Sequence, residues 1–114
     1  MGDSRFVITD NGILKEYHGN EEFLQIPDGV KVIGKGILGY SRGGNVRKLI
    51  IPEGVTEIQE GAFNTSKISE VILPSTLKKI GEWAFAACEN LKNVTIPDGV
   101  MLIPAFAFSW SGLE

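Results

Sequence analysis

The sequence predicts a solenoid of four stacked repeats, with a parallel ladder of short strands along one face. The first observation is a proline that recurs at positions 27, 52, 74 and 97, at intervals of 25, 22 and 23 residues. The second is that the same positions around each proline are apolar. Because one copy is too small to enclose a core, successive copies must bury these positions against one another.

The register of the repeat is clearest when the copies are aligned on their prolines. They read FLQIPDGVKVIGKGIL, KLIIPEGVTEIQEGAF, EVILPSTLKKIGEWAF and NVTIPDGVMLIPAFAF. Apolar residues stand three places and one place before the proline, and three, six and eleven places after it. The last of these positions holds Leu38, Phe63, Phe85 and Phe108. We expect these four side chains to lie in the core.

Residues 1–22 precede the repeats and predict a capping β-hairpin. Two apolar runs in RFVITDNGILKEYHG flank Asn11-Gly12, a dipeptide that is among the strongest short signals for a hairpin turn. A solenoid needs such a cap because its first repeat otherwise exposes core residues to water. Residues 23–114 then form the four repeats.

Each repeat is expected to begin with a strand that has one buried face, because the segment before the proline alternates, as in Val94-Thr95-Ile96. Proline lacks an amide donor and ends the strand. A turn pair follows, which is Asp28-Gly29, Glu53-Gly54, Ser75-Thr76 and Asp98-Gly99 in the four copies. The VxxI spacing then predicts a second short extended stretch, and the GEWAFAAC-type segment predicts a helical turn.

The C-terminal end of the array is predicted to be open. Leu113 falls in register to begin a fifth copy, so either the array continues beyond residue 114 or Leu113-Glu114 is the remnant of a cloning linker. In both cases we expect an adhesive apolar end that can mediate self-association, near Leu102, Phe106, Phe108 and Trp110.

Composition argues against several classes of function. The chain has 114 residues and a net charge of -3, without the clustered Lys and Arg that nucleic-acid binding requires. No apolar run approaches the roughly 20 residues of a membrane-spanning helix, and MGDSRFVITD lacks the apolar core of a signal peptide. A single cysteine, Cys88, excludes an internal disulfide framework and a cysteine-based zinc site.

The histidine and cysteine of the chain, residue types that often act in catalysis or bind metals, give no indication of a catalytic, cofactor or metal site. His18 is the only histidine, and we expect no nucleophile or carboxylate placed beside it. Cys88 stands where the other copies carry Ser41, Ser66 and Ser111. This interchange predicts a small side chain that is turned inward, rather than a thiol activated by a basic neighbour.

The repeat resembles the BspA-type leucine-rich repeat. The pattern LxxVxIPxxVxxIxxxAFxxCxxL is matched by residues 91–108, preceded by AFAACENL at 84–91, and the resemblance covers about residues 21–114. It implies a right-handed leucine-rich repeat solenoid, a strand-rich segment of an α/β-type horseshoe. A parallel strand ladder would lie on one face, with short strands or helical turns on the other. It also implies an extracellular or cell-surface bacterial protein of the adhesion or protein-binding kind, without catalysis.

The outward side chains of the predicted ladder form a candidate binding face, in two rows whose members are ~4.8 Å apart. One row is Phe23, Lys48, Glu70 and Asn93, and the neighbouring row is Gln25, Ile50, Ile72 and Thr95. Lys48 is expected to face Glu70. Exposed Ile50 beside Ile72 indicates contact area for a partner, although β-branched residues also favour exposed strand positions when no partner exists.

Two further aromatic residues, Trp83 and Phe106, stand where the first two copies have Gly36 and Gly61. They are expected to pack along the convex side, and a partly exposed Trp could also anchor a partner.

These features predict a non-catalytic recognition module that binds a protein or glycan partner through the ladder face. The alternative is a structural spacer or assembly unit whose open end mediates self-association. An enzyme is the third possibility, and the stacking of repeats predicts no ligand pocket for one.

Overall fold

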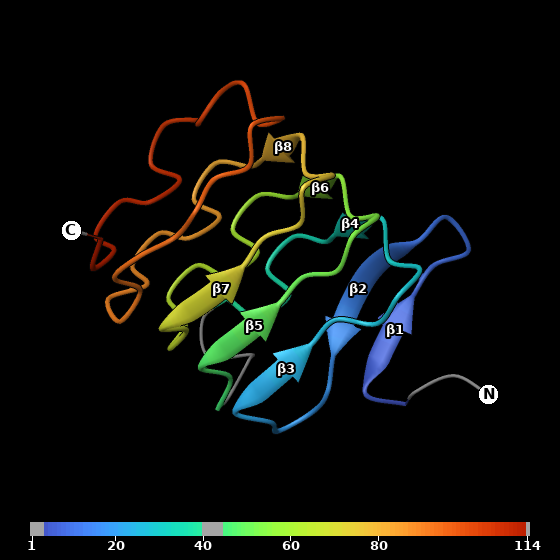
Figure 1. The fold of residues 1–114 in the computed structure, drawn as a ribbon. Coiled ribbons are helices and arrows are strands. Elements are labelled where there is room, and N and C mark those ends of the chain that lie inside the picture. Colours follow the sequence, from blue (N-terminus) through green and yellow to red (C-terminus); the bar gives the residue numbers. More distant parts are fainter. Residues whose placement is uncertain (1–3, 40–44, 114) are drawn as a thin grey trace.

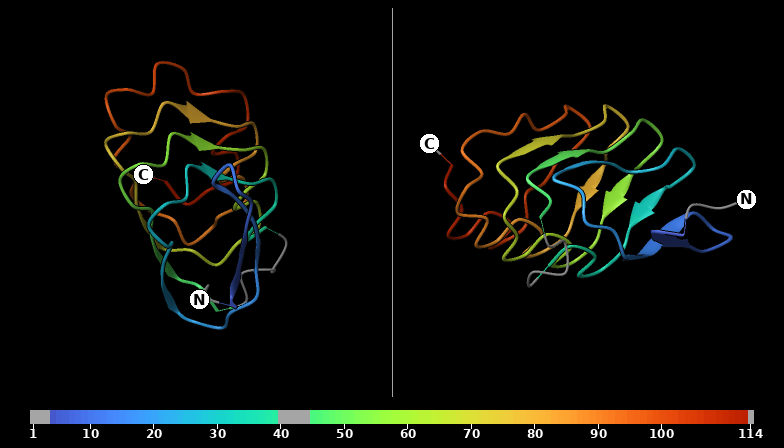
Figure 2. Two further views of the ribbon diagram at one scale, coloured as in Figure 1. Left: turned by 90° about the vertical axis from the view of Figure 1, so that its right-hand side faces the viewer. Right: turned by 90° about the horizontal axis from the view of Figure 1, so that it is seen from below.

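The computed structural model describes residues 4–39 and 45–113. Within these residues the chain forms strands and turns and has no helix (Figure 1). The strands are β1 (Phe6–Ile8), β2 (Ile13–Tyr17), β3 (Phe23–Gln25), β4 (Val32–Ile33), β5 (Lys48–Ile50), β6 (Glu57–Ile58), β7 (Glu70–Ile72) and β8 (Lys79–Ile80). Successive coils stack along one direction, and the molecule measures 41 × 28 × 18 Å (Figure 2). The predicted solenoid is confirmed.

Strands β3, β5 and β7 form the parallel ladder that was predicted before the prolines. Leu24 pairs with Leu49, and Leu49 pairs with Val71. All three side chains are buried, whereas the strand residues on either side of them point outward. The alternation in the sequence therefore identified the buried face correctly in the first three copies.

The fourth copy departs from the prediction, because no strand is formed after β8 in the described residues. Val94 and Ile96 are half-buried, whereas Leu49 and Ile51 at the same repeat positions are buried. Within the described residues this copy packs against a neighbour on one side only, so its core positions stay partly open to water. The prediction of a fourth ladder strand is wrong for this reason.

A second sheet, in the order β1-β2-β4-β6-β8, lies across the core from the ladder (Figure 2). Its repeat strands are only two residues long, and each places one isoleucine in the core, namely Ile33, Ile58 and Ile80. These strands confirm the second extended stretch. The core of the molecule lies between the two sheets.

The segment after each of these strands forms consecutive turns, not the helical turn that we predicted. In the third copy, Ala86 N donates to Trp83 O at 3.1 Å, which closes one turn. Phe85 N instead donates to Ala107 O of the next copy at 2.7 Å. A helix would bond its amides within its own segment. Here alternate amides bond from copy to copy, so the turns form a third ladder along the solenoid.

The phenylalanines eleven places after the prolines lie in the core or pack against it, as predicted, and their rings lie next to one another. The ring centroids of Phe63 and Phe85 are 5.0 Å apart, and those of Phe85 and Phe108 are 5.2 Å apart. Phe63 and Phe85 are buried, whereas Phe108, in the last copy, is half-buried.

The N-terminal hairpin is formed by β1 and β2, as Asn11-Gly12 predicted. Gly12 adopts a φ of 85°, a left-handed conformation that costs glycine little. Strand β2 also pairs in parallel with β4, so the hairpin adds a strand to the second sheet besides covering the first repeat. Leu14 and Tyr17 are buried by this arrangement. The boundary between cap and repeats at residue 22 stays a prediction.

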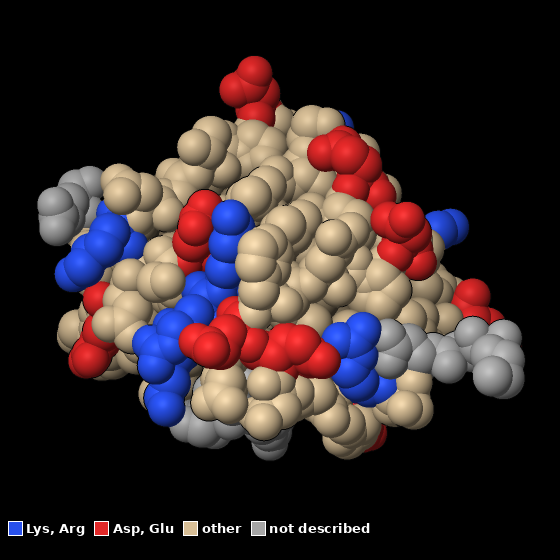
Figure 3. All heavy atoms as spheres, turned by 60° about the horizontal axis from the view of Figure 1, so that its bottom comes forward, with Lys and Arg blue, Asp and Glu red and all other residues tan. Residues whose placement is uncertain are grey.

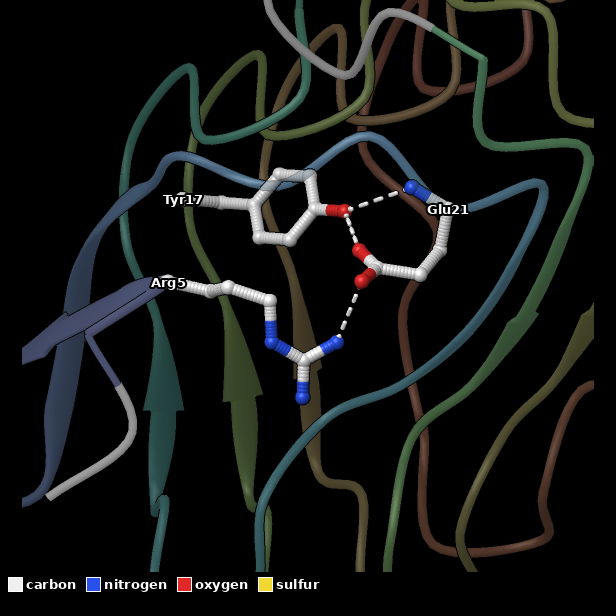
Figure 4. Close-up of polar contacts among 3 residues, drawn as sticks. All are labelled: Arg5, Tyr17 and Glu21. Carbon is white, nitrogen blue, oxygen red and sulfur yellow. Dashed lines mark hydrogen bonds and ion pairs between the residues drawn. The ribbon is translucent and has the colours of Figure 1, made fainter.

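Three side chains connect the hairpin to the chain that enters β3 (Figure 4). The Tyr17 hydroxyl donates to Glu21 Oε1, and Arg5 Nη1 donates to Glu21 Oε2 at 2.7 Å. The hydrogen bond from Tyr17, followed by the one from Arg5, holds the pKa of the Glu21 carboxyl below its ordinary value of 4.5. The network therefore favours the ionised form of Glu21 in the folded protein.

This lowered pKa predicts a specific loss of stability in acid. A group whose folded pKa is depressed stabilises the fold above its unfolded pKa, and that contribution is lost as the pH falls through the folded pKa. We expect the Tm of the parent to fall more steeply below about pH 4.5 than the Tm of Glu21→Gln. Thermal unfolding in a pH series measures both, and parallel curves would contradict the network's role.

Candidate binding face

The two outward rows of the ladder are formed as predicted on β3, β5 and β7. Phe23 lies beside Lys48, and Lys48 lies beside Glu70. The second row places Gln25, Ile50 and Ile72 next to one another in the same way. The face formed by these six side chains is called the ladder face below.

Lys48 links the members of the first row. Its Nζ lies 4.9 Å from the centroid of the Phe23 ring and 3.7 Å from Glu70 Oε2, which confirms the predicted pair. The Phe23 side chain stays 56% exposed. Because the ion pair is open to solvent, it contributes at most about 1 kcal/mol to stability. Its main effect is to hold the Lys48 ammonium over the exposed Phe23 ring.

The second row is apolar where β5 and β7 meet. Ile72 is 46% exposed and Ile50 is half-buried beside it. A hollow of about 400 Å³ lies next to this row and is lined by Glu53, Val71, Ile72, Leu73, Ser75, Thr95 and Pro97. The Glu53 carboxylate accepts hydrogen bonds from Ser75 N at 2.9 Å and Ser75 Oγ at 2.5 Å, which fixes one wall of the hollow.

The last two predicted members of the rows, Asn93 and Thr95, are exposed but belong to no strand. Thr95 lines the hollow beside Ile72, so it still borders the ladder face. Asn93 lies instead along a second hollow, of about 450 Å³, at the open end of the array. The structure thus brings seven of the eight predicted residues to one surface and places the eighth beside it.

Charge on this side of the molecule is mixed. Figure 3 views the side on which β3, β5 and β7 begin, and there acidic and basic side chains lie next to one another in a band beside an uncharged area. Such a surface has no extended electrostatic field of one sign. It can therefore orient a bound partner, but it does not attract a charged partner from a distance.

Cys88 has the structural role that its exchange with serine predicted. The thiol is buried, lies 3.4 Å from Ser66 Oγ and donates to Phe63 O at 3.0 Å. Burial raises the pKa of the Cys88 thiol, which disfavours the nucleophilic thiolate. These contacts are typical of a cysteine that is packed in a core rather than of a reactive thiol.

His18 does have a carboxylate neighbour, contrary to our expectation. Its Nε2 lies 2.7 Å from Glu16 Oε1, because residues two apart on an extended segment share a face. Both side chains are more than half exposed, at 57% and 58%. Among the described residues, no group of His, Cys, Asp and Glu side chains is arranged to hold a metal ion.

One feature of the surface was not predicted. A groove of about 590 Å³ runs along the turns that follow β4, β6 and β8, although we expected no pocket from stacked repeats. Trp83 and Trp110 line it. The replacement of glycine by Trp83 within the repeat was the one sign of it in the sequence.

Comparison with known proteins identifies the repeat. The family model for the BspA type leucine rich repeat region (6 copies) matches residues 16–114, a range that begins within β2. No curated protein gave a match to the chain. No helix that could span a membrane is present in residues 4–39 and 45–113.

Solved structures share the fold. A leucine-rich repeat protein from Bacteroides capillosus is 29% identical with a TM-score of 0.80, and the match covers 96% of this chain and 88% of that one. A Treponema protein described as "T. pallidum Leucine Rich Repeat protein" is 20% identical with a TM-score of 0.70, covering 95% of this chain and 65% of that one.

A leucine rich cell surface protein from Faecalibacterium prausnitzii is 24% identical with a TM-score of 0.76. That match covers all of this chain and 42% of the other, so this chain spans less than half the length of that protein. With the family model matching most of its length, the chain belongs to the BspA-type leucine-rich repeat family.

Proposed function

We propose that the chain is a non-catalytic recognition module whose ladder face binds a protein or glycan partner. The observation that carries the proposal is the pair of adjacent rows in which exposed Phe23 and Ile72 lie beside charged Lys48 and Glu70. Apolar side chains on a rigid sheet supply the centre of an interface, and charges beside them set the orientation of the partner. The shallow hollow next to Ile72 adds a concave element to this surface.

The module would be part of a longer cell-surface or secreted protein with an adhesion role. The similarity to the cell-surface protein of F. prausnitzii, of which this chain spans 42%, supports this location. A rigid repeat array can present one surface at a distance from an anchor without any need for catalysis.

The test is the double substitution Ile50→Lys with Ile72→Lys. Both side chains are outward on the ladder, so we expect thermal unfolding to be unchanged. Partner binding should weaken at least about tenfold, because two charges would enter the centre of the contact. Biolayer interferometry against a panel of purified extracellular-matrix proteins and cell-surface glycoproteins measures the parent and the variant.

A matched control adds the same charge elsewhere. Val32→Lys with Thr56→Lys places one lysine on β4 of the second sheet and one directly before β6, where Val32 is half-buried and Thr56 is exposed. An equal loss of binding in this control would assign the effect to added charge alone. Unchanged binding by the ladder variant would refute the ladder face as the binding site.

A second candidate function is self-association through the open end. Met101 and Leu102 are 88% and 77% exposed, whereas the second and third copies carry Thr56-Glu57 and Lys78-Lys79 at these positions. Ile103, in a core position, is 44% exposed, and the hollow beside it is lined by Val94, Ile96, Phe108 and Leu113 among others. Apolar residues at two positions that are both polar in the second and third copies favour a contact at this end.

A further inference from the structure

The turn segments have left-handed backbone at two positions, nine and thirteen residues after the proline, and the second position of the first copy lies outside the described residues. At the first position φ lies between 62° and 64°, in Gly36, Gly61, Trp83 and Phe106. At the second position φ lies between 55° and 59°, in Thr65, Ala87 and Trp110. The turn ladder therefore imposes this conformation whatever residue stands there.

Three large aromatic residues occupy these positions in the third and fourth copies: Trp83, Phe106 and Trp110. Left-handed backbone strains a bulky residue, and glycine is the favoured occupant. Burial does not offset this strain at Phe106 and Trp110, which are 54% and 76% exposed, and Trp83 is only half-buried. The first two copies form the same turn with Gly36 and Gly61. Folding of the turn therefore does not require aromatic residues at these positions.

The aromatic residues form an ordered surface. The rings of Trp83 and Phe106 stack with centroids 4.6 Å apart and an interplanar angle of 12°. Trp83 and Trp110 come from different copies and line the same groove of about 590 Å³, which we call the turn groove. This volume is within the range of sites that hold small organic ligands. The turn groove shares no lining residue with the ladder face.

The rest of the groove is small or polar. Its small lining residues are Gly36, Gly61, Ala86 and Ala87, and its polar ones are Lys35, Glu60, Asn64 and Thr65. The small residues allow a flat ring to approach the backbone closely. Thr65 Oγ1 donates to Asn64 Oδ1 at 2.8 Å, which orients the Asn64 carboxamide.

This chemistry fits a ligand with an apolar face and many hydroxyl groups. One ammonium and one carboxylate leave the groove without net charge, so it selects neither an anion nor a cation. Together with the carboxamide and the hydroxyl, they offer both donors and acceptors. An indole face accepts the C–H face of a sugar ring as it would any apolar group. We propose that the turn groove binds a neutral saccharide chain, with a pyranose ring packed on Trp83 or Trp110.

A proline-rich peptide also packs on aromatic side chains, but the turn groove favours it less. Such peptides place proline rings in apolar slots between aromatic residues. Here the other residues that line the groove are glycine, alanine and residues with polar side chains. A peptide is therefore a competing outcome of the test rather than part of the proposal.

Intrinsic fluorescence gives a site-specific assay, because the chain contains two tryptophans and both line the turn groove. The probes are linear neutral hexasaccharides of β-glucan, xylan, mannan and N-acetylglucosamine. Sialylated and sulfated oligosaccharides and a proline-rich decapeptide serve as comparators. We expect at least one neutral hexasaccharide to shift and quench the tryptophan emission of the parent in a saturable way, with binding confirmed by calorimetry.

The variants take their residues from the protein itself. Trp83→Gly and Trp110→Thr install what the second copy carries at the same two positions, Gly61 and Thr65. Each should melt within a few degrees of the parent and bind the hexasaccharide at least about tenfold more weakly by calorimetry. Ile50→Lys with Ile72→Lys should bind it as the parent does, which separates this site from the proposed ladder-face function.

The proposal is overturned if no neutral hexasaccharide changes the emission at millimolar concentration. It is also overturned if only the charged oligosaccharides or the decapeptide do so. Unchanged saccharide affinity in folded Trp83→Gly and Trp110→Thr would likewise place the binding site elsewhere.

Discussion

Phe85→Ala is expected to lower the free energy of unfolding by about 3–5 kcal/mol, the range for truncation of a buried phenylalanine. Phe85 is fully buried, and its ring lies between those of Phe63 and Phe108. Neither neighbour can fill the space, since each belongs to a separate copy held by its own backbone bonds. For a chain of this length the Tm should fall by roughly 10–20 °C. Thermal and urea unfolding followed by circular dichroism measure the change.

Phe108→Ala is the matched control for Phe85→Ala. It removes the same side chain from the same repeat position, but Phe108 is half-buried in the last copy. Its loss of stability should be clearly smaller than that of Phe85→Ala. Equal losses, or a negligible change in Phe85→Ala, would contradict the repeat register on which the fold rests.

Removal of the apolar pair at the open end is expected to weaken concentration-dependent association strongly. In Met101→Thr with Leu102→Glu, the fourth copy receives the Thr-Glu pair of the second copy. Full burial of such apolar side chains contributes roughly 1.5–3 kcal/mol each, and the new carboxylate must also be desolvated in any contact. We therefore expect association to weaken at least about tenfold.

Static light scattering over a concentration series measures this association. The parent should show a mass that rises with concentration, whereas the variant should keep the mass of a monomer. The ladder variant, Ile50→Lys with Ile72→Lys, serves as the control and should associate as the parent does. A parent that stays monomeric across the series would reject the open end as an assembly surface.

Several features were predictable because they depend on local pattern repeated along the chain. The alternation around each proline identifies the inward residues of β3, β5 and β7, and the shared register then places Lys48 beside Glu70 and Ile50 beside Ile72. The exchange of Cys88 with serine predicts its inward position. Asn11-Gly12 predicts the hairpin because its turn conformation is a property of those two residues.

Other features depend on which copies are joined by backbone hydrogen bonds. This pairing is a property of the assembled solenoid. Phe85 N bonds to Ala107 O of the next copy, so turns replace the helical segment that composition favours. Strand β2 joins the second sheet because β4 offers it an open edge. The segment around Val94 forms no strand because no copy packs on its other side in the described residues.

The sequence by itself therefore determined the repeat, its register, its core and the rows of the ladder face. Only the tertiary structure decided where Trp83 and Trp110 point, because they lie in different copies and meet through the left-handed turns that stacking imposes. Side chains on one strand share a face by local geometry alone, whereas a groove between turns exists only once the copies are stacked.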